Sequence, residues 1–228
     1  MATRRGQAGG TAVYLELGAK RVFACALDWP GWCRSGKDEG QALEALAAAA
    51  PRYARVAMEA GLACPVDAVG AFEVVDRLPG STTTDFGAPG AVAPRDAEPL
   101  TREEAERLAA LVAASWTVFD RVVASAPAEL RKGPRGGGRD RDAVVEHVLA
   151  AEVAYARKLG VRHRQPARGD VAAVAALRAG IVEALHAAAE GMPVVEKGWP
   201  PRYAARRIAW HVLDHAWEVE DRGGPPPG

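Results

Sequence analysis

Two histidines, His211 and His215, lie four residues apart in the segment IAWHVLDHAWEVED. On an α-helix a four-residue step advances the chain by about one turn, so both imidazoles would lie on one face. Two imidazoles placed in this way can bind one metal ion. They can also be two hydrogen-bonded polar side chains in a partly solvated groove.

A third histidine, His147, lies in the segment AVVEHVLAAEVAY, where Val144 and Ala151 flank it at helical spacing. It therefore projects from or beside an apolar stripe. If its helix faces the helix of the His211 and His215 pair, the three imidazoles can hold a catalytic divalent ion and leave coordination positions open. Ligating rings also need partners for their second nitrogens. The nearby carboxylates that could serve are Glu146, Asp214, Glu218 and Asp120.

The elements that must position these histidines are four predicted helices in residues 101–222. Thr101 and Glu104 form a capping box at the start of the first helix. The second helix starts at Asp142 and carries His147, and the third is capped by Asp170. The fourth starts at Pro200 and carries the histidine pair. Four helices with short connections favour a four-helix bundle, an all-α domain.

Residues 11–77 predict a different domain, of α+β class. TAVYLEL and RVFACALD alternate as in a hairpin, CRSG is a third short strand, and AFEVVDRL is a last strand. Between them an alanine-rich helix starts at Asp38 and should break near Pro51. We expect a small antiparallel sheet with a helix. Residues 78–100 are rich in Pro, Gly, Ser and Thr, which predicts a linker between the two domains.

Composition limits the partners. The chain has 29 basic and 29 acidic residues, so it lacks the charge excess of a general nucleic-acid binder, and nucleic acid is not an expected partner. We expect no membrane association, because no apolar run looks long enough to span a bilayer. Three irregularly spaced cysteines do not form a disulfide framework, which favours the reducing cytoplasm. Cys33 is expected to be a packed side chain in preference to a nucleophile.

The segments VVEHVLAAEVAY and AWHVLDHAWEVED together resemble the DinB/YfiT-like superfamily of metal-binding four-helix bundles. In that superfamily one histidine of the second helix and an HxxxH pair of the last helix bind a divalent metal. The resemblance implies that His147, His211 and His215 are the ligands of zinc, with nickel as the alternative. Some members are thiol transferases that use mycothiol or bacillithiol, and others have no assigned activity.

The N-terminal half is similar to the HicB-like antitoxin fold, through two strands followed by LDWPGWCRSGKDEGQALEAL. Trp32 separates Gly31 from Cys33, which departs from the simplest form of the Pro-Gly-Cys turn. The resemblance implies a module for interaction, dimerisation or substrate covering. A homodimer through this domain or through the bundle is one expected assembly.

These observations predict a metal-dependent enzyme that transfers a low-molecular-weight thiol onto an electrophilic small molecule. Asp214 or Glu218 would orient an imidazole or accept a proton. Arg135 and Arg139, in the glycine-rich loop before the helix of His147, could bring a guanidinium to an anionic substrate or cofactor, although such a loop is also typical of a plain connector. The alternative is a non-catalytic metal-binding sensor or partner-binding protein with a HicB-like interaction module.

Overall fold

The computed structural model describes residues 10–63, 72–133, 137–190, 195 and 197–224. Its contacts divide the chain into two compact units. The first unit comprises Met1–Asp28, Trp32–Ala54 and Ala63–Ala91, and the second comprises Trp29–Gly31, Arg55–Leu62 and Val92–Gly228. The last boundary between them, at residue 91, lies inside the segment that the sequence predicts as a linker.

The first unit is built on a four-stranded sheet in the order β3-β2-β1-β4. Its strands are β1 (Thr11–Leu17), β2 (Val22–Ala26), β3 (Cys33–Gly36) and β4 (Phe72–Pro79). β1 and β2 form the expected antiparallel hairpin, and β3 continues it. The expectation of an antiparallel sheet is wrong for β4, which pairs with β1 in parallel. The helical connection between β3 and β4 supplies the long crossover that a parallel pair needs.

Two helices follow the hairpin, α1 (Glu39–Ala48) and α2 (Ala50–Glu59). The expected break is confirmed: Pro51 lies in the first turn of α2, where its missing N–H leaves no hydrogen bond unmade. The core beneath α1 contains Trp32, which is 1% exposed and donates its indole N–H to the carbonyl of Leu46 at 2.9 Å. Its ring stacks on Tyr53 with centroids 5.4 Å apart.

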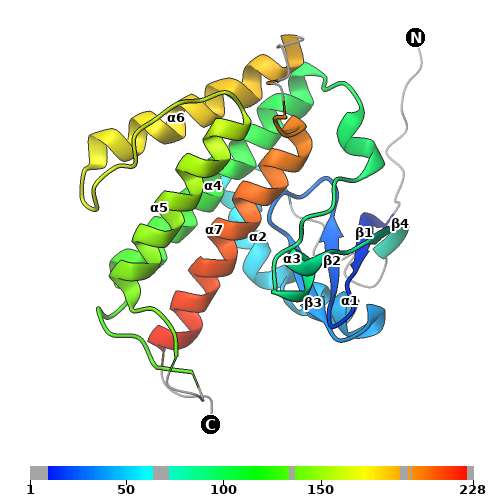
Figure 1. The fold of residues 1–228 in the computed structure, drawn as a ribbon, viewed down its shortest axis with the longest axis horizontal. Helices are drawn as coiled ribbons and strands as arrows, with labels where there is room; N and C mark the ends of the chain where they lie inside the picture. Colours follow the sequence, from blue (N-terminus) through cyan, green and yellow to red (C-terminus); the bar gives the residue numbers. More distant parts are fainter. Residues whose placement is uncertain (1–9, 64–71, 134–136, 191–194, 196, 225–228) are drawn as a thin grey trace. The chain divides into compact units, whose positions relative to one another are not determined.

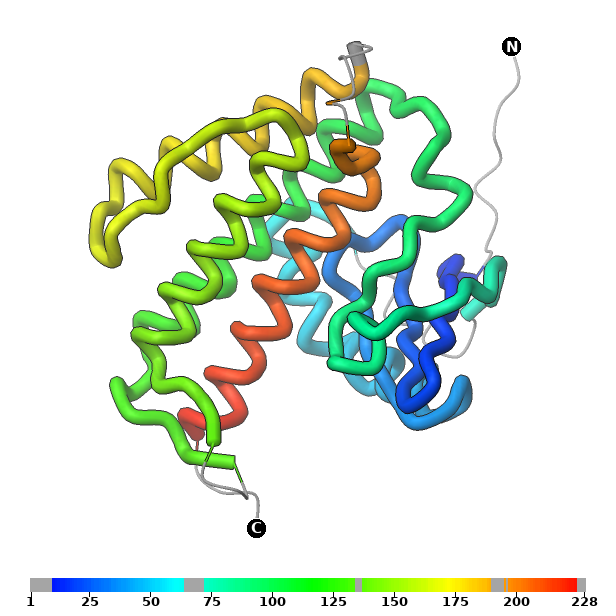
Figure 2. The backbone as a smooth tube through the Cα atoms, viewed as in Figure 1, coloured from blue at the N-terminus to red at the C-terminus, as the bar shows by residue number. Residues whose placement is uncertain are grey.

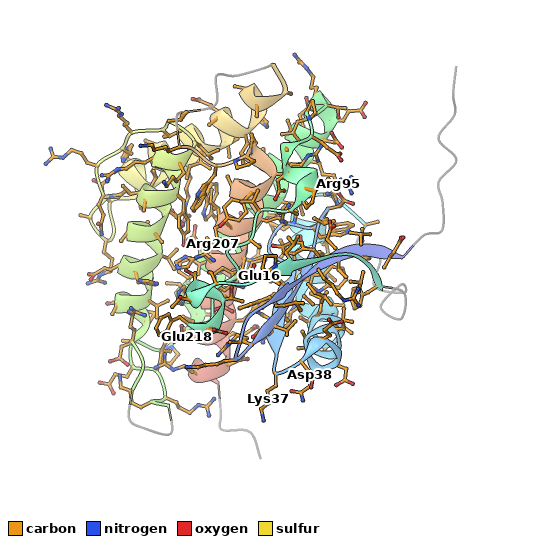
Figure 3. All side chains as sticks on the ribbon, turned by 45° about the vertical axis from the view of Figure 1, so that its right-hand side comes forward. Glu16, Lys37, Asp38, Arg95, Arg207 and Glu218 are labelled. Atoms are coloured by element: carbon orange, nitrogen blue, oxygen red, sulfur yellow. The ribbon has the colours of Figure 1, made fainter. Side chains whose placement is uncertain are left out.

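The buried carboxylate of Glu16 holds residues 80–91 onto this unit, and Figure 3 labels it. It accepts hydrogen bonds from the Thr84 hydroxyl at 2.5 Å and from the backbone N–H groups of Gly90 and Ala91 at 2.9 Å each. Thr84 belongs to α3 (Thr82–Asp85), a short helix capped by Ser81. The first half of the expected linker is therefore ordered through a carboxylate far away in the sequence.

The second unit contains four long helices (Figure 1), in agreement with the helical class expected for residues 101–222. They are α4 (Arg102–Ser125), α5 (Arg141–Lys158), α6 (Val171–Ala187) and α7 (Pro201–Gly223). α4 and α5 each pack against α6 and α7. Figures 1 and 2 both show α5 and α7 side by side. Two short 3₁₀ helices, η2 (Pro94–Ala97) and η3 (Ala188–Glu190), complete the unit.

The predicted helix starts agree closely with these bounds. Thr101 and Glu104 form the capping box of α4, and Asp170 accepts a hydrogen bond from the Ala173 N–H at the start of α6. α5 begins at Arg141, one residue before the expected start. From the sequence we expect no apolar run long enough to span a bilayer, but the length and hydropathy of α4 would allow it. Half of that apolar window is buried inside the protein, as in a core helix.

Two ion pairs, one of them buried, fix the N-terminal half of α7. Arg206 makes two hydrogen bonds of 2.6 Å to the carboxylate of Asp96, which lies in η2 and is itself buried. Arg202, one turn earlier, contacts Glu104 of α4 at 2.8 Å and the carbonyl of Pro99 at 3.1 Å. The second half of the expected linker is therefore tied to α7 by side chains that the sequence pattern did not mark.

The Glu16 anchor predicts a specific loss of stability. In Glu16→Ala the N–H groups of Gly90 and Ala91 lose their acceptor in a part-buried site, so the free energy of unfolding should fall by on the order of 3 kcal/mol. Urea unfolding measures the change, and limited proteolysis should cut residues 80–91 faster than in wild type. Glu39→Ala, which removes an exposed ion pair with Arg77, is the control and should change little. Equal stability of the two variants would contradict the anchoring role.

Candidate metal centre

Two helices of the second unit bring three imidazoles together. α5 contributes His147, and α7 contributes His211 and His215 one turn apart. The Nε2 atoms of His147 and His211 are 3.2 Å apart. The ring centroids of His215 lie 4.8 Å from that of His147 and 4.7 Å from that of His211. One potential ligand atom from each of the three residues lies within 4.8 Å of the other two.

Burial lowers the pKa of two of these imidazoles, those of His147 and His211. It is the main cause that lowers the pKa of His211 to about 2, and the neighbouring His215 and His147 and the charge of Arg207 act in the same direction. Burial also lowers the pKa of His147, with smaller contributions from His215 and from Arg139. A neutral imidazole has the free lone pair that a metal ligand needs, so metal binding does not have to displace protons from these two rings near neutral pH.

Glu218 fixes the orientation of His215. Its carboxylate lies 2.8 Å from the Nδ1 atom of His215, and its other oxygen accepts a hydrogen bond from Arg222. The hydrogen bond from His215 is the largest cause that lowers the pKa of Glu218, so this group is a carboxylate. An Nδ1–H that donates to Glu218 leaves the Nε2 lone pair of His215 free toward the other two rings.

No family model, curated protein or solved structure matches the chain. What the cluster can bind therefore follows from its chemistry.

The donor atoms fit a divalent ion. Metal–nitrogen bonds of about 2.0–2.1 Å in a tetrahedron place the nitrogens about 3.3 Å apart, close to the 3.2 Å between His147 and His211. The wider separations, up to 4.8 Å, require a small rotation of the rings on binding. Without an ion, the same 3.2 Å suits an N–H···N hydrogen bond between neutral rings.

Two of the other carboxylates named from the sequence pair with arginines. The carboxylate of Asp120 lies 2.7 Å from the guanidinium of Arg178, which also pairs with the buried Glu152. The carboxylate of Glu146 lies 3.7 Å from the guanidinium of Arg168. Asp214 is half-buried, and because each helical residue turns about 100°, its side chain leaves α7 in a different direction from that of His215. Glu218 does contact a ring, with 2.8 Å between its carboxylate and the Nδ1 atom of His215. Proton transfer by Glu218 or Asp214 stays a prediction.

The sequence predicts that Arg135 and Arg139 could bring a guanidinium to an anionic substrate or cofactor. Arg139 is exposed, and its charge is a minor cause of the lowered pKa of His147 and of His211. Arg135 lies outside the described residues.

In the first unit, Cys33 of β3 faces Cys25 of β2, with 2.6 Å between the two sulfur atoms. Burial raises the pKa of Cys33 well above its usual value, which keeps it a thiol and disfavours a nucleophilic role.

An aromatic wall beside His211 was missed in the sequence. Tyr155 of α5 meets the His211 ring edge-on with centroids 5.6 Å apart, and Trp199 packs on Tyr155 at 5.1 Å. The ring centroid of Trp210 lies 6.2 Å from that of His211. Arg207 covers both Tyr155 and Trp210. The four-residue spacing that pairs His211 with His215 also places Arg207 one turn before His211. The sequence could therefore have predicted that Arg207 lies on the same face as the histidines.

The triad predicts metal content. Wild type should bind about one divalent ion per chain, and His211→Ala or His215→Ala should lose most of it, because each removes one of three nitrogen donors. Elemental analysis of protein loaded with zinc and desalted measures this. His186→Ala, at an exposed position on α6, is the matched control and should keep its ion. Unchanged metal content in both triad variants would disprove the assignment.

Glu218 predicts a smaller effect on the same site. Glu218→Ala removes the acceptor of the His215 Nδ1–H but no donor to the ion, so zinc affinity should fall by about 10–100-fold without being lost. Competition with a coloured chelator gives the dissociation constant. A fall as large as that of His215→Ala would instead indicate that Glu218 is itself a ligand.

Proposed function

We propose that the second unit is a DinB/YfiT-like four-helix bundle and that the protein is a metal-dependent enzyme. The reaction we propose is transfer of a low-molecular-weight thiol, of mycothiol type, onto an electrophilic small molecule. The observation that carries this proposal is the composition of the ligand group. Within the part of the chain that the structure describes, the one cluster of close donors consists of His147, His211 and His215, with no carboxylate or thiolate among them.

Three imidazole donors suit catalysis better than a structural role. A structural zinc ion usually has four protein ligands, whereas a catalytic one keeps a position for water or substrate. His147 and His215 are only partly buried, so small molecules can approach the cluster. Zinc is the ion we favour, and nickel is the alternative.

The residues would divide the work as follows. His147, His211 and His215 hold the ion, which when bound lowers the pKa of a thiol and supplies a thiolate at neutral pH. Glu218 keeps His215 in the tautomer that ligates. In the transfer the thiol loses its proton and its sulfur forms a bond to an electrophilic carbon. The electron pair displaced from that carbon leaves with a leaving group or takes up a proton.

The first unit has a supporting role in this proposal. Its three antiparallel strands followed by α1 support the resemblance to a HicB-like module. We assign it to protein contacts, including contacts with a second copy of the chain, or to covering the substrate. The cytoplasm is the compartment that suits a thiol cofactor and free cysteines.

A thiol should bind the metal-loaded protein and stabilise it. At a hundredfold excess over its dissociation constant, mycothiol should add about 2.7 kcal/mol to the free energy of unfolding, because it binds the native state alone. Melting temperatures with and without thiol measure this. His147→Ala and chelated protein should show no rise. In cobalt-loaded protein, thiol should add a sulfur-to-metal charge-transfer band that the disulfide form does not produce.

The same measurements separate the two classes of function. If no cellular thiol changes the melting temperature or the cobalt spectrum while the ion still binds the three histidines, the transferase is ruled out. A metal-binding sensor or partner-binding protein would then be the better description.

A further inference from the structure

The C-terminal turn of α7 is held by the segment that precedes α5. The backbone N–H of Arg131 donates to the carbonyl of Arg222 at 3.1 Å, and Nε of Arg222 donates to the carbonyl of Arg131 at 2.7 Å. The guanidinium of Arg131 also donates to the carbonyl of Asp221. In Figures 1 and 2 this segment, in green, lies beside the red end of α7. Two residues that are 91 positions apart in the sequence are thus joined in both directions.

Gly138 lies against the guanidinium of Arg222. A Cβ atom at position 138 would lie 2.6 Å from Nη2 of Arg222 and 2.8 Å from its Cζ, so only glycine allows this close approach. The φ angle of Gly138 is +117°, which other residues rarely adopt. The backbone at Gly138 and the carbonyl of Arg131 together hold the Arg222 side chain in one position.

Arg222 passes this constraint on to the ring of His215. Its Nη1 atom donates to Oε1 of Glu218 at 2.5 Å, and Oε2 of the same carboxylate lies 2.8 Å from Nδ1 of His215. Arg222 and the imidazole use different oxygens, so they orient the carboxylate without competing for one atom. The three residues follow one another at steps of three and four along α7, where side chains of one helix meet. Figure 3 labels Glu218, the middle member of this chain.

We propose that Arg222 is a positioning residue of the metal centre. Held by Arg131 and Gly138, it keeps Glu218 in the orientation that accepts the Nδ1–H of His215, and this directs the Nε2 lone pair toward the other two histidines. The inference rests on the metal site of the proposed function but not on thiol transfer. Without Arg222 the Glu218 side chain has several rotamers open to it, so the His215 Nδ1–H loses its acceptor for part of the time.

Charge and orientation predict opposite effects of Arg222 on metal affinity. A guanidinium near the site repels a divalent cation, so its removal should strengthen metal binding if charge alone mattered. If Arg222 acts by orienting Glu218, its removal should weaken metal binding. The sign of the change therefore identifies the role.

A double-mutant cycle on the zinc affinity of the full-length protein tests the proposal. Arg222→Ala should weaken zinc binding by about tenfold, the lower end of the range for partners outside the ligand set. In a Glu218→Ala background the same change should alter the dissociation constant by less than about twofold, because the residue through which Arg222 acts is gone. Competition with a coloured chelator gives all four constants. An equal loss in both backgrounds, no loss, or a gain in affinity would overturn the proposal.

Two neighbouring glycines test the clamp without a change to α7. Gly138→Ala should push the guanidinium of Arg222 aside and weaken zinc binding toward the Arg222→Ala value, since a long side chain moves more easily than backbone. Gly137→Ala is the matched control, because a Cβ there meets no atom within 4 Å, and it should keep the wild-type affinity. Equal affinities of these two variants would contradict the clamp. This pair also serves if Arg222→Ala does not fold, as circular dichroism would show.

The tautomer of His215 tests the same role in metal-free protein. At about pH 8, above the pKa of an ordinary imidazole, long-range ¹H–¹⁵N spectra report which ring nitrogen carries the proton. Wild type should show the Nδ1–H form of His215, and Arg222→Ala should show a mixture with the Nε2–H form, as Glu218→Ala should. If wild type binds no zinc, the proposed metal centre fails, and the tautomer still decides the role of Arg222. An unchanged His215 tautomer in Arg222→Ala would overturn that role.

Discussion

The packing of α5 against α7 is the contact on which the site depends. The turn of α7 alone places His211 and His215 together, but His147 arrives only if α5 lies alongside in one register. Val144 and Val148, which flank His147 on α5, are fully buried and fix that register by close packing. A slip of one residue would turn the imidazole by about 100° and carry it away from its 3.2 Å approach to His211.

The axial position and rotation of α7 are fixed in turn by side-chain contacts toward both of its ends. Arg206 and Asp96 are buried with two short hydrogen bonds, and such pairs contribute specificity more than net stability, because desolvation offsets most of their attraction. Near the other end, Arg222 donates a hydrogen bond to the carbonyl of Arg131, which lies outside the helix. The histidines lie between these constraints, so the helix cannot rotate without breaking a buried charge pair.

The sequence predicted the local part of this structure and missed the long-range part. Helical spacing paired the histidines, the capping box placed the start of α4, and Pro51 marked the helix break, because each signal depends on neighbours in the chain. The parallel pairing of β4 and the anchors in residues 78–100 depend on partners far away. Glu16 meets Gly90 across 74 residues and Asp96 meets Arg206 across 110. A single acidic residue in a strand or a proline-rich segment carries no local mark of such a partner.

The three arginines of the segment RYAARR show how one helix separates support from chemistry. Arg202 and Arg206 are one turn apart and share a face, where buried or half-buried carboxylates take up their charge. Arg207 follows Arg206 directly, so its side chain leaves the helix about 100° further round, toward Tyr155, Trp210 and the histidines. The charges on the first face are matched within the protein and stabilise one arrangement of helices. On the second face, the guanidinium of Arg207 lies against the rings of Trp210 and Tyr155, and Tyr155 contacts His211. One helix therefore carries the contacts that position it on one face and the candidate metal ligands with their aromatic neighbours on another.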